Sequence, residues 1–376
     1  MRTILQVVPA LNSGGVERTT IEIAEALTRA GDVALAASAG GRLEPDLAAA
    51  GGELVRMALD SKNPLTIWAN AGKIAALARA RGVALIHARS RAPGWSAYWA
   101  AKRLKLPFVT TYHGIYNAKT PLKRWYNSVM AKGDIVIANS HYTRAHVMET
   151  YALAPERVVA IPRGVDLRIF DPDAVSGERV AALKAAWRIG EEIVLLLPAR
   201  LTRWKGQALA IEAAARAFGE RKFTLVLVGE GREDYRAELE ALAQRLGVAA
   251  NVRLPGHVVD MAAAYKLADI ALTPSLEPEA FGRAAAEAQA MGVPVIAANH
   301  GGFTETIIHR ETGLLAAAGD VEALKDAILT LEALGAEARA GMGNAAKARA
   351  RELYSLSALQ RETLRVYDRL LGAVTK

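Results

Sequence analysis

The sequence predicts an α/β protein with two doubly wound parallel sheets, and three observations predict this fold. In both halves of the chain, short apolar runs alternate with stretches of helical periodicity, which is typical of parallel sheets covered by helices on both faces. The length of 376 residues exceeds what one hydrophobic core usually holds. At Pro162, Gly164 and Pro172, two prolines and a glycine fall within eleven residues, which indicates a connection between domains.

The expected elements follow from this alternation. In the first half, buried strands are expected at residues 4–8, 33–37, 84–87, 108–111, 135–138 and 158–161. The helices between them are expected at residues 16–30, 65–81, 94–104, 122–131 and 143–151. In the second half, strands are expected at residues 193–197, 224–228, 252–254, 270–273, 295–297 and 313–315. The two domains should therefore span residues 1–168 and 169–352, and a helical run over residues 353–376 is long enough to return to the first domain.

The composition excludes several classes of protein. With 52% hydrophobic and 23% charged residues, the chain is expected to be globular and not disordered. It contains no cysteine, which excludes disulfide scaffolds, thiolate metal sites and cysteine nucleophiles and fits a reducing cytosol. The N-terminus lacks the pattern of a signal peptide, and no stretch approaches the ~20 apolar residues that span a bilayer. We therefore expect a cytoplasmic protein.

The charge is distributed unevenly along the chain. Of the formal net charge of +8, residues 1–170 contribute 22 Lys and Arg against 12 Asp and Glu, or +10, and the remaining residues contribute 25 against 27, or −2. A basic first half suits an anionic membrane surface, a phosphorylated acceptor or nucleic acid, or is simply a basic surface. No recognised nucleic-acid-binding motif is present, so nucleic acid is not expected as a partner.

One short segment could bring this charge to a membrane. Residues 119–132 combine Lys and Arg with Trp125, Tyr126 and Met130 on one short helix. This composition is typical of a helix that lies on anionic lipid, here the inner face of the cytoplasmic membrane. Trp125 and Met130 could both belong to the core of an ordinary surface helix, and this alternative is slightly favoured.

The residues that follow each strand are candidates for a binding site, because ligands bind at the carboxyl ends of the strands in doubly wound sheets. After the first strand come Gly14 and Gly15, whose turn lets a ligand approach the backbone, and then Glu17. This turn does not match the GxGxxG dinucleotide fingerprint, so a nicotinamide cofactor is not indicated. Later strand ends present Arg89, which could serve an anionic acceptor, and His113, which is placed to meet a polar ligand.

Three strand ends of the second half carry further candidates. The first presents Arg200 and Lys205 on a loop that enters a helix, where a guanidinium and an ammonium can hold a diphosphate. The other two are glycine turns, which let a flat base approach the backbone. These turns contain Gly229 and Glu230, and Gly256, His257 and Val258.

Residues 274–294 follow the strand expected at residues 270–273 and carry the acidic candidates. Glu277 and Glu279 lie on a proline-broken loop, and a helix that starts near Gly282 carries Glu287 in its second turn. The N–H groups at a helix N-terminus suit a phosphate. Carboxylates accept hydrogen bonds without donating any, which suits the hydroxyls of a sugar. A phosphate flanked by sugars is a nucleotide sugar.

Taken together and in this order, the motifs closely resemble those of the GT-B glycosyltransferases of family 4, over nearly the whole chain. The residues that carry the resemblance are Gly14, Gly15, Glu17, the sequence IPRGVD at 161–166, Arg200, Lys205, Glu279 and Glu287. The resemblance implies two Rossmann-like domains that face each other across a cleft, with the donor held mainly by the second and the C-terminal helix packing on the first. Within the family, the chain is similar to lipopolysaccharide-core or glycolipid transferases of Gram-negative bacteria.

The resemblance also implies roles for single residues. Arg200 and Lys205 would bind the diphosphate, Glu287 the ribose hydroxyls and Glu279 the transferred sugar, while His113 matches a histidine near the reacting centre; the expected catalytic residues are thus His113, Arg200, Lys205 and Glu279. The other expected donor contacts are Gly14, Gly15, Gly229, Glu230, Gly256, His257, Val258, Ala280, Phe281, Gly282 and Arg283. The residues expected on the acceptor side are Glu17, Arg89, Tyr112, Lys123 and Arg124.

The implied reaction is retaining and metal-independent, and it moves a hexose-type sugar from a UDP-, GDP- or ADP-linked donor to a saccharide or lipid-linked acceptor of the cell envelope. No strand-end carboxylate in the first half offers a nucleophile for double displacement. We therefore expect same-face attack, in which the departing diphosphate takes the acceptor proton while Arg200 and Lys205 stabilise it. Asp171 and Asp173 superficially match the Asp-x-Asp metal clamp of another glycosyltransferase fold, but turn and capping chemistry explains them better, and no metal is assigned.

One residue departs from the family pattern, and two alternatives to a transferase stay open. Arg163 occupies a position where the family commonly has asparagine. A nucleotide-sugar epimerase on the same fold needs a donor but no acceptor. A non-catalytic nucleotide-sugar-binding protein would need only the donor site, although the presence of Arg200, Lys205 and both glutamates favours an enzyme.

Overall fold

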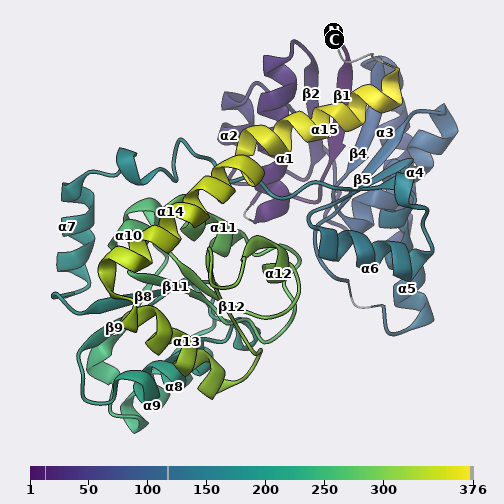
Figure 1. Ribbon diagram of the computed structural model, residues 1–376. Helices are drawn as coiled ribbons and strands as arrows, with labels where there is room; N and C mark the ends of the chain where they lie inside the picture. Colours follow the sequence, from purple (N-terminus) through teal and green to yellow (C-terminus); the bar gives the residue numbers. More distant parts are fainter. Residues whose placement is uncertain (13, 117, 373–376) are drawn as a thin grey trace. The chain divides into compact units, whose positions relative to one another are not determined.

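The protein is described by a computed structural model that covers residues 1–12, 14–116 and 118–372 (Figure 1). Its chain forms two compact units. Unit 1 comprises Met1–Gly164 together with Leu356–Lys376, and unit 2 comprises Val165–Ser355. The units meet in sequence at Gly164, four residues before the boundary expected from the sequence. Of the helical run expected at residues 353–376, residues 353–355 belong to unit 2, the helix that belongs to unit 1 is Leu356–Leu371, and residues 373–376 lie outside the described residues.

Unit 1 is built on a parallel sheet in the order β3-β2-β1-β4-β5-β6-β7. Its strands are β1 (Thr3–Val7), β2 (Val33–Ser38), β3 (Glu53–Arg56), β4 (Val83–Ala88), β5 (Phe108–Tyr112), β6 (Ile135–Ala138) and β7 (Val158–Ala160). Its α-helices are α1 (Gly15–Arg29), α2 (Glu44–Ala49), α3 (Pro64–Ala80), α4 (Arg91–Leu104), α5 (Pro121–Asn127), α6 (His141–Tyr151) and α15 (Leu356–Leu371). The strand order reverses between β1 and β4, where doubly wound sheets usually bind ligands.

Unit 2 repeats the plan with a parallel sheet in the order β10-β9-β8-β11-β12-β13. Its strands are β8 (Ile193–Pro198), β9 (Phe223–Val228), β10 (Val252–Gly256), β11 (Ile270–Thr273), β12 (Val295–Ala298) and β13 (Gly313–Ala316). Its α-helices are α7 (Gly177–Ala186), α8 (Gln207–Phe218), α9 (Glu233–Arg245), α10 (Met261–Leu267), α11 (Arg283–Ala290), α12 (Phe303–Thr306), α13 (Val321–Ala333) and α14 (Gly335–Leu353). Here the order reverses between β8 and β11, so the loops that follow these two strands meet at the switch point.

Burial explains why most of these elements were predictable. Strands such as β5 and β9 are buried along their whole length, since helices cover both faces, and their sequences are therefore continuous apolar or β-branched runs. The sequence did not predict β3 or α2. The edge strand β3 has no buried residue, and α2 buries only Leu47, so neither produces a recognisable hydrophobic pattern.

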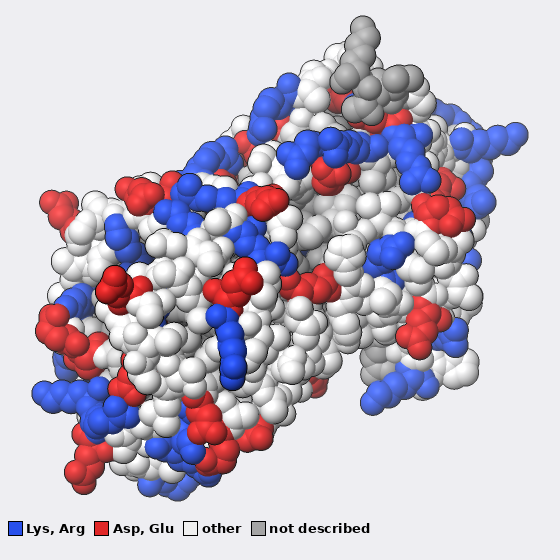
Figure 2. Space-filling view, viewed as in Figure 1, with Lys and Arg blue, Asp and Glu red and all other residues white. Residues whose placement is uncertain are grey.

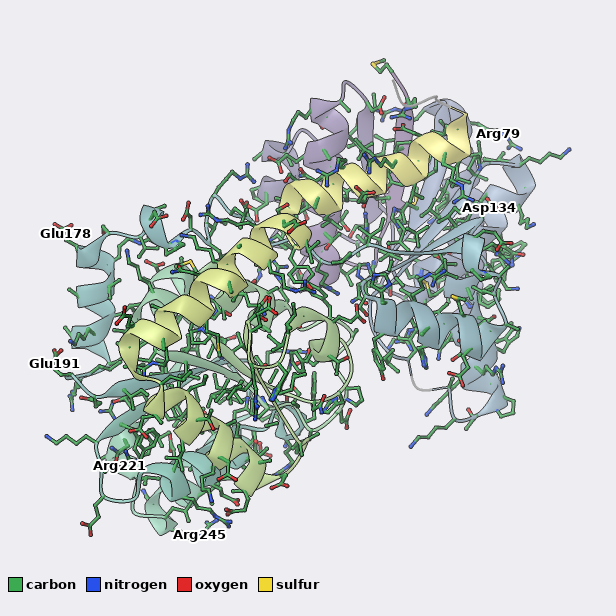
Figure 3. The ribbon with its side chains drawn as sticks, in the orientation of Figure 1. Arg79, Asp134, Glu178, Glu191, Arg221 and Arg245 are labelled. Atoms are coloured by element: carbon green, nitrogen blue, oxygen red, sulfur yellow. The ribbon has the colours of Figure 1, made fainter. Side chains whose placement is uncertain are left out.

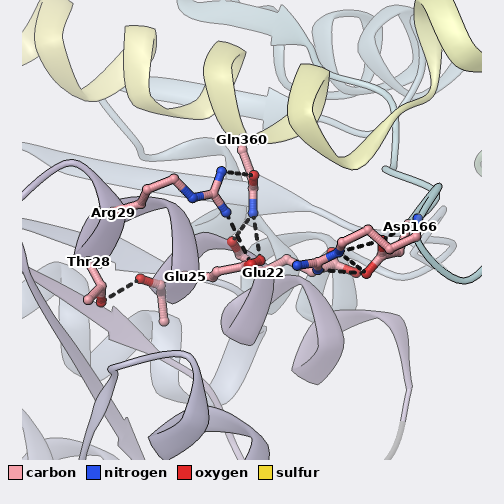
Figure 4. Close-up of polar contacts among 8 residues, drawn as sticks. Glu22, Glu25, Thr28, Arg29, Asp166 and Gln360 are labelled. Atoms are coloured by element: carbon pink, nitrogen blue, oxygen red, sulfur yellow. Dashed lines mark hydrogen bonds and ion pairs between the residues drawn. The ribbon is translucent and has the colours of Figure 1, made fainter.

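The C-terminal helix α15, drawn in yellow in Figure 1, packs against α1 and β4 of unit 1. Gln360 on α15 donates hydrogen bonds from Nε2 to the Glu22 carbonyl oxygen at 2.8 Å and to Glu25 Oε2 at 3.1 Å (Figure 4). Tyr367 is fully buried, and its hydroxyl lies 2.6 Å from Nδ1 of His87 in β4. The helix is therefore an integral part of the core of unit 1.

Figure 3 draws the side chains on the ribbon, and the six charged residues that it labels lie on the outside of the two units. The labelled examples are all exposed: Arg79, Asp134, Glu178, Glu191, Arg221 and Arg245. In the part of the chain that the structure describes, no helix has both the length and the apolar composition of a bilayer-spanning segment.

Candidate active site

In unit 2, the loops that follow β8 and β11 are locked together by one glycine. Gly206 has a φ of +78°, and a Cβ atom at this position would lie 2.2 Å from the Pro274 carbonyl oxygen. Only glycine fits both the backbone conformation and the space. A hydrogen bond from the Leu276 N–H to the Trp204 carbonyl oxygen, 2.7 Å long, joins the same two loops. The residue before Gly206 is thereby held beside residues 274–279.

That residue is Lys205, and its ammonium forms an ion pair with Oε1 of Glu279. The same oxygen accepts a hydrogen bond from the Ser275 hydroxyl at 2.9 Å, and the ammonium lies 4.2 Å from the centre of the Trp204 ring. The two charged side chains keep 19% and 17% of their exposure, so both are fixed in place and still reachable. The structure thus brings together two residues that are 74 positions apart in the sequence.

Arg200 lies at the same edge of the sheet as Lys205 and differs from it in exposure and in pairing. Its side chain is exposed, and among the residues described it has no hydrogen-bond or ion-pair partner. Its carbonyl oxygen accepts a hydrogen bond of 2.9 Å from the side chain of Gln207, which fixes the backbone of the loop. A guanidinium with all its donors available is suited to an anionic ligand.

The start of α11 is the third part of this region. Gly282, with a φ of +91°, precedes the helix, and no side chain caps the first N–H groups of α11. The backbone ahead of it is anchored, because the Gly302 N–H donates to the Glu279 carbonyl oxygen at 2.7 Å and Phe281 is 3% exposed. As expected, the helix begins next to Gly282 and Glu287 lies in its second turn. The N–H groups at the start of a helix can receive an anion or an oxygen-rich ligand.

Glu287 is oriented by two neighbours. Its Oε1 accepts a hydrogen bond from Arg283 Nε at 2.8 Å, and its Oε2 accepts one from the Tyr265 hydroxyl at 3.3 Å. Burial, together with the Glu287 carboxylate, raises the pKa of Tyr265 well above its usual value, so the phenol stays a donor. Each carboxylate oxygen retains a second lone pair for a ligand hydroxyl, and the side chain is 15% exposed.

The glycine turns expected to meet a base lie on adjacent strands. A Cβ atom on Gly229 would lie 2.2 Å from the Ala199 carbonyl oxygen, and the Gly229 N–H donates to the Gly256 carbonyl oxygen at 2.9 Å. A Cβ atom on Gly256 would meet no atom within 4 Å. Glu230 and His257 are exposed and Val258 is half-buried. The structure therefore brings both turns to the edge that carries Arg200.

In unit 1, His113 follows β5 and faces Arg163. Nδ1 of His113 lies 3.3 Å from Nη2 of Arg163, and because a guanidinium only donates, Nδ1 must accept and Nε2 must carry the proton. Burial, followed by the charge of Arg163, lowers the pKa of His113 well below its usual value. Nε2 is buried and has no hydrogen-bond partner among the described residues. His113 is therefore a neutral ring with one unused donor.

The Gly14–Gly15 turn lies next to the same arginine. A Cβ atom on Gly15 would lie 1.6 Å from Nη1 of Arg163, and Gly14 has a φ of +126°, with its own Cβ position 2.8 Å from Glu17 Oε2. Arg163 thus occupies the space above the first residue of α1. The sequence singled out Arg163 as unusual but did not predict this contact.

Two of the residues expected on the acceptor side prove to be buried. Arg89 is 2% exposed and donates to Gln6 Oε1 at 2.9 and 2.7 Å, and Tyr112 is 0% exposed. Neither side chain can contact an acceptor in this structure, because the sheet and its covering elements enclose both. Lys123 and Arg124 are exposed on α5, and Glu17 is half-buried.

The structure also settles two local alternatives. Met130 is fully buried as expected, but Trp125 is 58% exposed, so the interpretation of Trp125 as a core residue is wrong. Asp171 accepts a hydrogen bond from the Asp173 N–H at 3.2 Å at the start of a 3₁₀ turn, which is the capping role expected from the sequence. Within the described residues, no group of three or more His, Asp or Glu side chains is arranged to hold a metal ion.

Sequence reasoning missed the residues that support the glutamates. Ser275 donates a hydrogen bond to Glu279, and Tyr265 donates one to Glu287. Ser275 could have been singled out because it directly follows the start of the loop after β11. Tyr265 lies on α10, and no pattern in the sequence marked it as a candidate.

Comparison with known proteins agrees with this organisation. A family model described as Glycosyl transferases group 1 matches residues 181–349, and another, described as Glycosyltransferase Family 4, matches residues 13–169. A D-inositol 3-phosphate glycosyltransferase of Segniliparus rotundus is 30% identical over 284 residues, which cover 70% of this chain and 62% of that protein. The chain therefore spans less than two thirds of the length of this relative.

Solved structures show the same architecture. The crystal structure of a glycosyltransferase from Rickettsia africae matches with a TM-score of 0.92 and 35% identity over 99% of both chains. Anabaena HepE, solved in complex with UDP and glucose, matches in fold with a TM-score of 0.85 and 23% identity over 98% of this chain and 100% of that one. The two parallel sheets confirm the fold expected from the sequence. With both of its halves matched by family models and nearly its whole length matched by the Rickettsia structure, the chain belongs to the family 4 glycosyltransferases of the GT-B fold.

Proposed function

We propose that the protein is a retaining glycosyltransferase that moves a hexose from a nucleotide-diphosphate sugar to an acceptor of the cell envelope. The observation that carries this proposal is the convergence of Lys205, Glu279 and Arg200 on the loops after β8 and β11, at the switch point of unit 2. This region offers cations for a diphosphate and a carboxylate for sugar hydroxyls within one rigid set of loops.

The donor is proposed to lie along the strand ends of unit 2. The exposed Arg200 and the ammonium of Lys205 would bind the diphosphate, and the N–H groups at the start of α11 would assist them. Glu287, held by Arg283 and Tyr265, would accept hydrogen bonds from the ribose hydroxyls. UDP is the nucleotide we favour, because the structurally similar HepE was solved with UDP and glucose.

Glu279 is proposed to position the sugar. Its carboxylate already accepts hydrogen bonds from Lys205 and Ser275, which disfavours its use as a nucleophile and suits an acceptor for sugar hydroxyls. In a same-face substitution, the anomeric carbon–oxygen bond to the diphosphate breaks and the acceptor oxygen bonds to that carbon. The acceptor proton passes to the departing diphosphate, whose charge Arg200 and Lys205 stabilise. His113 is kept as a proposed catalytic residue, and its Nε2–H is the donor that it has available.

Two classes of acceptor are candidates. The sequence resemblance favours a lipopolysaccharide core or another glycolipid. The name of the Segniliparus relative favours a phosphorylated polyol as the second candidate, and exposed cations of unit 1 such as Lys123 would suit a phosphate. Incubation with donor and either class of acceptor distinguishes the two by the mass of the product.

Donor binding and turnover test the function directly. UDP-, GDP- and ADP-hexoses are compared for thermal stabilisation of the protein and for transfer. Arg200→Ala and Lys205→Ala should each lower turnover by about 10²–10³-fold, the size expected when one preorganised charge partner of a leaving group is lost. Arg245→Ala, which removes an exposed cation at the end of α9, is the matched control and should keep full activity. Full activity in both site variants would refute the assignment, and an isomerised donor formed without acceptor would indicate an epimerase.

A further inference from the structure

One stretch of unit 1 contains no acidic residue. Residues 61–133 hold 13 Lys and Arg and no Asp or Glu, so this stretch carries +13 while the rest of the chain sums to −5. The stretch includes α3, α4 and α5. Arg81 forms an ion pair with Glu53 of β3 and Arg89 is buried, so these two cations add little to the surface charge of the stretch.

The same stretch exposes large apolar side chains. Leu122 on α5 is 73% exposed, Trp125 is 58% exposed, and Trp99 on α4 is 38% exposed. On α3, Leu65 and Trp68 are 78% and 72% exposed. All three of the chain's strongly exposed tryptophans, among the described residues, therefore lie in the acid-free stretch.

Contacts show that the exposed groups on α4 and α5 form one patch. The buried Trp95 stacks on Trp125 with ring centres 4.9 Å apart, and its ring centre lies 5.6 Å from that of Trp99. Nε1 of Trp95 donates to the Tyr126 carbonyl oxygen at 3.0 Å, which fixes α5 against α4. We define Trp99, Leu122 and Trp125 as the aromatic patch. Trp95 supports both tryptophans of this patch from the protein interior.

A hollow lined by lysines adjoins this patch. It has a volume of about 450 Å³, and Lys102, Lys105 and Lys132 line it together with Tyr98. The Lys132 ammonium lies 5.4 Å from the centre of the Tyr98 ring and 6.0 Å from that of Trp95, which connects the hollow to the patch. Asp134 also lines the hollow and accepts a hydrogen bond from the Phe108 N–H at 2.8 Å. Three cations against one carboxylate leave the hollow positive.

We propose that this face of unit 1 docks on an anionic phospholipid bilayer, with the aromatic patch in the headgroup region and a lipid phosphate in the lysine hollow. Tryptophan and leucine beside an excess of lysine is the composition that binds the interface of such a bilayer. Lys and Arg side chains project from the edge of unit 1 that carries α5 (Figure 2). A protein partner with an apolar surface would not require this excess of cations over carboxylates.

The inference rests on the proposed function in one respect, since a lipid-borne acceptor would be presented at this face. Docking itself needs no donor and no turnover. It can therefore be measured separately, and loss of either activity leaves the other interpretable.

Vesicle flotation tests the proposal with the full chain. The wild type is mixed with vesicles of phosphatidylcholine alone or with about 30% phosphatidylglycerol, at an ionic strength of about 0.1 M. We expect binding to the anionic vesicles that weakens with salt, and weak binding to phosphatidylcholine. Leu122→Gln with Trp125→Gln, and separately Lys102→Ala with Lys105→Ala and Lys132→Ala, should each reduce anionic binding about tenfold or more.

The control removes the same charge from exposed positions of unit 2, as Arg188→Ala with Lys222→Ala and Arg245→Ala. It should bind the vesicles almost as wild type does. An equal loss in this control would overturn the proposal, because binding would then follow net charge alone. Absence of vesicle binding, or a dimer in sedimentation that the Leu122 and Trp125 changes dissolve, would also overturn it. Donor-induced thermal stabilisation of each variant should stay at the wild-type level and serves as the check on folding.

Discussion

Replacing Gly206 by alanine should break the link between the two loops that carry Lys205 and Glu279. Alanine at a φ of +78° costs about 1–2 kcal/mol for the left-handed conformation alone. In addition, its Cβ would lie 2.2 Å from the Pro274 carbonyl oxygen, a backbone atom that must retreat by about 1 Å. Overpacking of this kind adds about 1–3 kcal/mol, so the total loss of stability should be about 2–5 kcal/mol. Displacing Lys205 by this distance should also lower kcat by about 10²-fold.

Gly247→Ala is the matched control for this change. Gly247 lies in the same unit, has a φ of +71°, and a Cβ atom there would meet nothing within 4 Å. It should therefore lose only the conformational part, about 1–2 kcal/mol, and keep full activity. Urea denaturation gives the free energy of unfolding of both variants, and steady-state kinetics give kcat. Equal losses of stability in the two variants would refute the argument that the contact with Pro274 locks the loops.

Three further changes test other parts of the structure. Tyr367→Phe removes the hydroxyl that lies 2.6 Å from His87 Nδ1 and should destabilise unit 1 by about 1–3 kcal/mol in urea denaturation, because a buried ring nitrogen loses its partner. Lowering the pH from neutrality through 6.5 should destabilise unit 1, because burial holds the pKa of His87 and His113 below 6.5 in the folded protein. Below that pH the unfolded chain binds protons that the folded chain does not. Each histidine then lowers the free energy of unfolding by up to about 1.4 kcal/mol per pH unit. Arg163→Asn should raise the pKa of His113, measured by NMR titration of the ring, because the guanidinium is one cause of its depression.

Each of these has a contrary outcome. Unchanged stability in Tyr367→Phe would mean that the hydroxyl contributes nothing to the packing of α15. A free energy of unfolding that stays constant or rises between neutral and mildly acidic pH would contradict the neutral state of the buried histidines. An unaltered His113 titration in Arg163→Asn would show that burial alone sets its pKa.

The sequence was informative wherever burial shaped it. Strands such as β9, buried throughout, were found by their apolar runs, whereas β3 was not, because an edge strand without buried residues has no such run. Trp125 was misassigned because the sequence of a short helix does not show whether an aromatic side chain faces the core or the solvent.

The candidate site divides in the same way. Gly282 could be recognised from the sequence as the residue near which a helix starts, because glycine marks positions that other residues cannot occupy. The partner of a charged side chain could not be recognised. Nothing in the sequence showed that Arg89 would donate hydrogen bonds to Gln6, 83 residues away. The pairing of Lys205 with Glu279 depends on the order of the strands in the sheet, which the sequence does not show either.

The composition of unit 1 from both ends of the chain has a consequence for its synthesis. The 191 residues of unit 2 are inserted between β7 and α15, so Tyr367 and Gln360 are made only after unit 2 is complete. At about 5–20 residues per second, the surface of α1 and β4 that α15 covers would stay open on the ribosome for about 10–40 s. During that interval α15 does not yet cover His87 and the apolar core of unit 1. Unit 1 therefore cannot complete its core until unit 2 has been made.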